Sequence, residues 1–210
     1  MGAVAALTSV DARLLDLVAL AVRQAGEAVM AVYATDFLVQ GKADDSPVTE
    51  ADRRAEAILT PALQALLPGV PVVAEEAVSA GQQPTLRPGE PFWLVDPVDG
   101  TREFVSRNGE FTVNVALMAG GQPVLGVVQA PALGLLYAGG PGLGAWCEAG
   151  PPAGSTACAP ARRPLQCRRV PAEGLTVTAS RSHGDAEALD KFLDGRQVRS
   201  LKSAGSSLKI

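Results

Sequence analysis

The chain has little histidine and little cysteine. His183 is the single histidine among 210 residues, which argues against a transition-metal site built from imidazole. Any metal should therefore be a hard ion such as magnesium, held by oxygen ligands. The three cysteines, Cys147, Cys158 and Cys167, are an odd number without CxxC spacing. We expect reduced thiols, not a disulfide framework or a zinc site.

Long apolar runs and an excess of basic residues are also missing. No uninterrupted apolar stretch approaches the roughly 18 residues of a membrane helix, and the N-terminus lacks the basic-then-apolar order of a secretory signal. The net charge of −4 disfavours a nucleic-acid binder, which needs clustered lysine and arginine. With 47% hydrophobic residues, the chain can bury one large or two small cores. We expect a globular, cytoplasmic protein without a nucleic-acid partner.

Apolar residues recur at three- and four-residue steps in the first part of the chain. This spacing predicts an amphipathic helix over residues 11–34 and a second over 49–67. Beyond residue 70, short apolar runs separated by glycine and proline predict a meander of antiparallel strands. The stretch 148–174 is a low-order connection with one short strand, and a strand–helix–strand unit follows it. The order predicts an α+β half over 1–150 and an incomplete α/β half over 151–210.

The stretch "WLVDPVDGTREF" places Asp96 and Asp99 after an apolar run that predicts a strand buried on both faces. Carboxylates at the end of such a strand must be paired, hydrogen-bonded or bound to a cation. Pro97 and Gly100 predict a turn that aims both acids to one side. An ordinary Asp-Gly turn is the alternative.

A second acidic pair, Glu75 and Glu76, ends the apolar run "VPVVA". Two strands therefore deliver acids where each leaves the core. If the carboxylates converge, they can hold two divalent metals about 3.5–4 Å apart, an arrangement that hydrolyses phosphate esters.

Asp52 lies in "TEAD" at the start of the second predicted helix. Helix capping is its structural alternative, because Thr49 and Asp52 have capping-box spacing. Glu56, one turn on, is expected to face solvent. Thr101 follows the Asp-Gly pair where a short helix through "TREFV" could begin, and N–H groups at such a start bind phosphate.

The order of "DSPVTEAD", "AEEAV", "WLVDPVDGTREFVSRNGEFTVNVALM", "GVVQAP", "ASRSH" and "GSSLK" resembles the inositol monophosphatase-like superfamily. "DGTREF", "NGEFTVN" and "SRSH" are most similar to its bacterial 3'(2'),5'-bisphosphate nucleotidases of the CysQ type. The resemblance implies a layered αβαβα sandwich and magnesium-dependent hydrolysis of adenosine 3',5'-bisphosphate to AMP and phosphate. Inositol monophosphatase or fructose-1,6-bisphosphatase activity is the alternative among enzymes.

The resemblance also implies roles for individual residues. The implied magnesium ligands are Glu75, Asp96, the Val98 carbonyl and Asp99. The implied catalytic residues are Asp52 and Thr101, which position a water, with Glu75 assisting. The implied substrate-binding residues are Glu75, Asp99, Gly100, Thr101, Arg102, Arg181, His183 and Ser206, with Ser207 as a further candidate. The arm from Lys42 to Thr49 would cover the metals, with a charged surface loop as the alternative.

Family members continue beyond "GSSLK" into a WDxAAG element whose aspartate is another magnesium ligand. Here the only tryptophans are Trp93 and Trp146, and neither precedes an aspartate. The C-terminal half is therefore expected to be truncated, and the second of two or three magnesium ions to be held weakly. A fragment of a longer enzyme and a non-catalytic nucleotide-binding member both remain open. So do a homodimer and a peripheral position at the inner membrane.

Overall fold

The structure is a computed structural model that describes residues 10–35, 47–150, 161–181 and 186–209. The two predicted N-terminal helices are α2 (Ala12–Tyr33) and α3 (Pro47–Leu66). The Asp11 side chain caps α2 by accepting a hydrogen bond from the Leu14 amide at 2.8 Å. The second helix begins two residues before its predicted start, at a proline, which is favoured in the first helical turn.

The predicted meander forms a seven-stranded sheet in sequence order. Its first strand pairs in parallel with the second, and every later neighbouring pair is antiparallel. Its strands are β1 (Val72–Ala74), β2 (Phe92–Asp99), β3 (Thr112–Ala119), β4 (Gln122–Ala130), β5 (Leu135–Gly140), β6 (Gly144–Ala149) and β7 (Ala161–Leu165). The short helices α4 (Glu75–Ser79), α5 (Thr101–Val105) and η2 (Pro131–Leu133) lie between strands. Because β7 pairs with β6, the sheet continues past residue 150.

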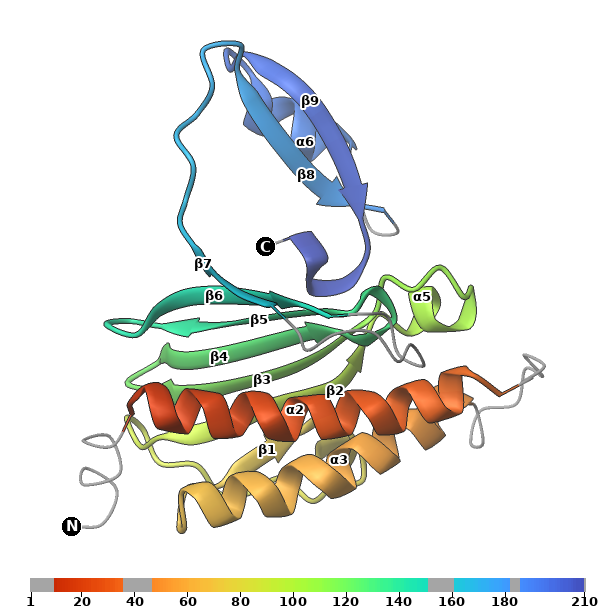
Figure 1. The fold of residues 1–210 in the computed structure, drawn as a ribbon, viewed down its shortest axis with the longest axis vertical. Coiled ribbons are helices and arrows are strands. Elements are labelled where there is room, and N and C mark those ends of the chain that lie inside the picture. Colours follow the sequence, from red (N-terminus) through yellow and green to blue (C-terminus); the bar gives the residue numbers. More distant parts are fainter. Residues whose placement is uncertain (1–9, 36–46, 151–160, 182–185, 210) are drawn as a thin grey trace.

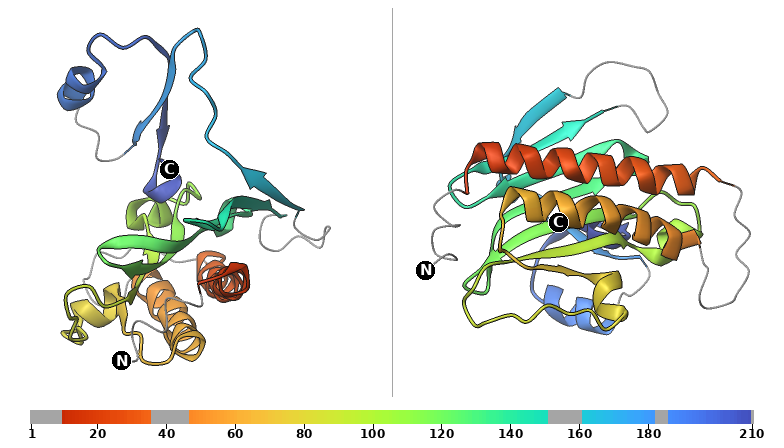
Figure 2. Two further views of the ribbon diagram at one scale, coloured as in Figure 1. Left: turned by 90° about the vertical axis from the view of Figure 1, so that its left-hand side faces the viewer. Right: turned by 90° about the horizontal axis from the view of Figure 1, so that it is seen from below.

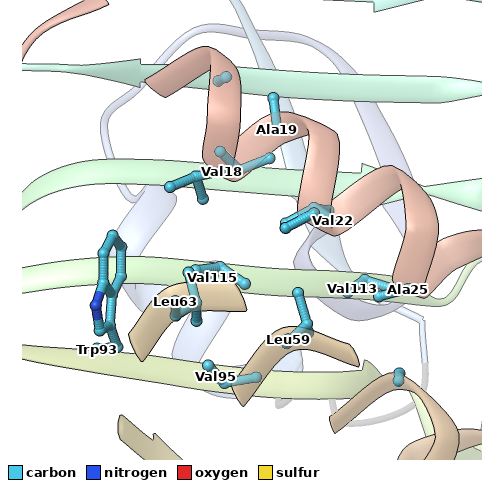
Figure 3. Packing of buried hydrophobic residues seen from close by; sticks show 14 of the residues in the cluster. Val18, Ala19, Val22, Ala25, Leu59, Leu63, Trp93, Val95, Val113 and Val115 are labelled. Carbon is cyan, nitrogen blue, oxygen red and sulfur yellow. The ribbon is translucent and has the colours of Figure 1, made fainter. Parts of the chain in front are cut away.

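The helices α2 and α3 lie side by side on one face of this sheet (Figures 1 and 2). Figure 3 shows side chains from both helices packed against the inner faces of β2 and β3. The labelled residues of this core are Val18, Ala19, Val22, Ala25, Leu59, Leu63, Trp93, Val95, Val113 and Val115. The expectation that β2 is buried on both faces is wrong, since Leu94 is 45% exposed. Its strand alternates because the two helices cover only one face of the sheet.

The predicted strand–helix–strand unit is present as β8 (Leu175–Ser180), α6 (Ala186–Leu193) and β9 (Val198–Ala204). The strands β8 and β9 pair in parallel and form a separate two-stranded sheet. Figure 1 shows this unit standing away from the large sheet, with the final turn η3 (Ser206–Lys209) returning beside α5. A boundary between two halves at residue 150 stays a prediction.

Two expectations from composition concern described residues. The thiols of Cys147 and Cys167 are free, whereas Cys158 lies outside the described residues. Within the described ranges, the helices are too short or too polar to cross a membrane.

Candidate active site

Parallel pairing brings the two predicted acidic strand ends to one edge of the sheet. Ala74 of β1 is in register with Val95 of β2, so Glu75 and Asp96 are the next residues on neighbouring chains. Their carboxyl groups lie within hydrogen-bonding reach of each other. The strand β1 ends at Ala74, and Glu75 and Glu76 are the first two residues of α4.

Asp52 joins these carboxylates from a different element. It lies on α3, five residues after the helix begins at Pro47, so the capping alternative is wrong. Its side chain is buried, with 6% of the residue exposed. Burial, followed by the nearby carboxylates of Glu76, Glu75 and Asp96, raises the pKa of Asp52 to about 8.

The expectation that Glu56 faces solvent is also wrong. Glu56 is half-buried, and its Oε2 accepts a hydrogen bond from the Glu76 amide at 3.1 Å. Burial raises its pKa. This hydrogen bond therefore connects α3 to the start of α4.

The predicted turn at "DPVDGT" differs from the observed backbone. The strand β2 continues to Asp99 and bends only at Gly100, which takes φ +98°. Asp96 pairs with Asn114 and Asp99 pairs with Thr112, so β2 carries one residue more than β3 over this interval. Two acids three apart would face opposite sides of a regular strand. The irregular pairing between Asp96 and Asp99 changes the direction of the later side chain, so both carboxylates can lie on the same side of the strand.

Asp96 is the carboxylate best suited to a cation. Burial, then Glu75 and Asp99, raises its pKa to about 7. Its Oδ1 is buried and meets no hydrogen-bond donor among the described residues. Since a buried, unpartnered carboxylate oxygen is costly, a bound cation would stabilise it. The oxygen donors of Glu75, Asp96, Asp99 and the Val98 carbonyl are the kind that magnesium prefers.

Asp99 is engaged with hydroxyl groups from the end of the chain. Its Oδ2 accepts hydrogen bonds from Ser206 Oγ at 2.5 Å and Ser207 Oγ at 2.7 Å, with Thr112 Oγ1 at 3.5 Å. In the described part of the chain, no three acidic, histidine or cysteine side chains form a ready-made metal shell. Asp99 lies close enough to Asp96 to affect its pKa. One of its carboxylate oxygens is nevertheless occupied by hydrogen bonds from Ser206 and Ser207.

A pocket of about 650 Å³ lies beside Asp99. Its walls come from the β2–α5 segment, from the last residue of β8 and from η3. They contain Asp99, Gly100, Thr101, Arg102, Glu103, Ser180, Ser206, Ser207 and Lys209. The structure thus brings together most of the predicted substrate-binding residues, although their contacts with a substrate stay predictions.

Arg181, a predicted substrate-binding residue, is not among the residues that line this pocket. It forms an ion pair with Glu110 at 2.7 Å. His183 and the arm residues 42–46 lie outside the described residues.

Sequence reasoning did not single out Glu110, Thr112 or Asn114. All three contact the C-terminal segment: Glu110 through Arg181 and the Gly205 amide, Thr112 through Ser206 Oγ at 2.6 Å, and Asn114 through Ser207 Oγ at 3.0 Å. A signal was present, since these polar residues alternate in "GEFTVN" and alternate residues of a strand share a face.

Carboxylates gathered at one edge of a layered fold suit a phosphatase that works with bound metal ions. Comparison with known proteins identifies the family. The profile of the inositol monophosphatase family matches residues 11–210, and the chain belongs to this family. The 3'(2'),5'-bisphosphate nucleotidases CysQ of Escherichia coli O157:H7 and of strain K12 are each 42% identical to it over 199 residues. Each alignment covers 94% of this chain and 75% of the relative.

Solved structures give the same family. CysQ from Bacteroides thetaiotaomicron superposes with a TM-score of 0.72 at 32% identity, covering 96% of this chain and 76% of that one. Mycobacterium tuberculosis SuhB gives a TM-score of 0.66 at 26% identity, covering 93% and 70%. These likenesses confirm the mixed α+β sandwich that the resemblance implied.

Proposed function

We propose that the chain is a magnesium-dependent phosphomonoesterase that hydrolyses adenosine 3',5'-bisphosphate to AMP and phosphate. The main support for this proposal is that the carboxyl groups of Asp52, Glu75 and Asp96, which come from three elements, lie near one another. A pocket lined by Asp99 lies beside them. The 42% identity to CysQ nucleotidases over 94% of the chain supports the nucleotide substrate.

Within this proposal, Glu75, Asp96, Asp99 and the Val98 carbonyl would hold two or three magnesium ions. Magnesium, when bound, neutralises charge on the phosphoryl oxygens and makes water a better nucleophile at neutral pH. Asp52 and the hydroxyl of Thr101, an exposed residue, would orient that water, and the Asp52 carboxylate would accept its proton. Glu75 assists from the start of α4.

The substrate side of the pocket offers hydroxyls and cations. Ser206 and Ser207 place hydroxyls on Asp99, and Arg102 and Lys209 also line the walls. Two cationic side chains suit a substrate with a second phosphate group, because charge-assisted contacts to phosphate are strong. A single small-molecule substrate, and not a nucleic acid, fits a chain of net charge −4.

The test is phosphate release from adenosine 3',5'-bisphosphate, with magnesium and with a chelator. We expect magnesium-dependent release by the unchanged protein and a loss of about 100-fold or more in Asp96→Asn, since the metals supply several kcal/mol. Glu90→Gln is the matched control, because Glu90 is an acid in an exposed pair with Arg87. Equal rates for the unchanged protein and Asp96→Asn would refute the assignment of Asp96.

A substrate panel separates the alternatives. Faster release from inositol monophosphate or fructose 1,6-bisphosphate would replace the nucleotide as substrate. Calorimetry that detects nucleotide binding without turnover at high magnesium would show a non-catalytic member.

A further inference from the structure

The carboxylate of Glu110 accepts three hydrogen bonds, all of them from the part of the chain after β8. Its two carboxylate oxygens accept a forked pair from Arg181, at 2.7 Å from Nη2 and 3.0 Å from Nε. Oε2 also accepts a hydrogen bond from the Gly205 amide at 2.8 Å. Arg181 Nη2 donates in addition to the Ser203 carbonyl at 3.2 Å. One carboxylate, just before β3, thereby fixes both the end of β8 and the end of β9.

The turn that Glu110 holds is closely packed. Gly205 is buried, and a Cβ added to it would lie 2.5 Å from Glu103 Cγ. The next residue, Ser206, has φ +49°, which is uncommon for a residue other than glycine. The surroundings must stabilise this backbone, because a side chain in the left-handed region is not favoured by itself.

The same turn aims two hydroxyls. Ser206 and Ser207 directly follow Gly205, and both donate to Asp99 Oδ2. A shift of this turn would move both hydroxyls away from Asp99 and out of the pocket wall that they share with it.

We propose that Glu110 is a positioning residue that holds the Gly205 turn, so that Ser206 and Ser207 lie correctly for substrate beside Asp99. This inference rests on the proposed function. It also gives Arg181 a different task from the direct substrate contact that the sequence suggested: Arg181 acts through Glu110.

An ordinary surface ion pair is the competing explanation. Such pairs contribute little, and Arg181 is half exposed. Here, however, the geometry is forked and the same carboxylate also accepts from the amide of a buried residue. The hydrogen bonds from Arg181 lower the pKa of Glu110, so the carboxylate is ionised at neutral pH.

The kinetic test compares Glu110→Ala, Glu110→Gln and the control Glu90→Ala. For adenosine 3',5'-bisphosphate we expect Glu110→Ala to raise KM about five- to tenfold, because Ser206 and Ser207 would no longer be held in place, and the loss should be about that of one net hydrogen bond. The kcat and the magnesium concentration for half-maximal rate should stay near their original values. Glu110→Gln should be intermediate, because its amide oxygen can still accept from Gly205. Glu90→Ala should leave all three quantities unchanged.

The double variant Glu110→Ala/Arg181→Ala tests whether the two residues act as one unit. Its KM should be no higher than that of the worse single variant. Multiplying effects would overturn the proposal, because Arg181 would then contact the substrate independently. An unchanged KM in Glu110→Ala, or a joint fall of kcat, magnesium response and thermal stability, would overturn it as well.

Hydrogen exchange makes this test independent of the proposed function. In Glu110→Ala the amides of residues 203–209 should exchange faster, while those of β3 and α2 keep their protection. Unchanged exchange in 203–209 would reject the positioning role even in an active enzyme. If the unchanged protein does not hydrolyse the nucleotide, the proposed function fails, and faster exchange would still support the hold of Glu110 on this turn.

Discussion

Asp52 is surrounded by acids in a buried position, so its ionisation opposes folding when no cation is present. Its folded pKa of about 8 lies above the ordinary 3.8. The folded state therefore binds a proton more tightly than the unfolded state over this interval. The stabilisation from the protonated carboxyl is complete below pH 4 and is lost as pH rises to about 8. Asp96, with a pKa of about 7, acts in the same direction.

We therefore expect the metal-free protein to become less stable between pH 4 and pH 8. Asp52→Asn should flatten this dependence and make the protein more stable than the original at pH 8. Urea unfolding in a chelator at pH 5, 6, 7 and 8 measures both effects. The same pH slope in both proteins would show that Asp52 does not carry the buried charge.

Sequence reasoning identified the acidic residues but not their surroundings. Asp96, Asp99 and Glu75 stood out because carboxylates after apolar runs are unusual. The role of Asp52 was ambiguous between helix capping and catalysis, because it depends on where the helix begins. The helix begins at Pro47, two residues before the predicted start. Glu56 was misjudged because its partner, the Glu76 amide, is 20 positions away.

At the scale of elements, α5 is anchored to the end of α2 by three aromatic rings. The Tyr33 ring lies 5.1 Å from that of Phe104 and 4.8 Å from that of Phe111, centroid to centroid. Arg107, just after α5, donates to the carbonyl of Tyr33 at 2.8 Å and to that of Thr35. These contacts fix the short helix that begins with Thr101.

We expect Phe104→Ala to lower the free energy of unfolding by about 3–5 kcal/mol, as for other buried aromatic residues. Phe104 is fully buried, and its removal leaves a cavity between α2 and α5. Phe192→Ala is the control, because Phe192 is 66% exposed and should cost no more than about 0.5 kcal/mol. Denaturant titration of both variants checks this, and similar losses would contradict the anchoring role.

Elements defined by interactions between residues close in the sequence could be predicted, whereas features that depend on distant residues could not. The helix α2 was predicted almost to the residue, since its spacing and its Asp11 cap are local signals. The irregularity between Asp96 and Asp99 depends on pairing with Asn114 and Thr112 of the next strand. No local pattern in β2 contains that information, so a turn was predicted where the strand continues.

At the scale of the molecule, cation binding and folding should be linked. Magnesium competes with protons for Asp96 and its neighbours, so binding should strengthen as pH rises through 7 to 8. At a magnesium concentration 100 times the dissociation constant, we expect about 2.7 kcal/mol of added stability. Thermal unfolding with and without magnesium measures this gain, which should be absent in Asp96→Asn and kept in Glu90→Gln. A gain that is equal at pH 5 and pH 8 would contradict the linkage to carboxylate ionisation.

The hydrogen bond between Asp99 and Ser206 joins residues 107 positions apart. During synthesis, which proceeds from the N-terminus, the growing polypeptide carries Asp99 out of the ribosome long before either serine has been translated. The large sheet can assemble around its acids in the meantime, with Thr112 of β3 and water as donors to this carboxylate. The pocket beside Asp99 can therefore be completed only after the strands of the large sheet have been made, and a translational stall before Gly205 would yield a sheet without it.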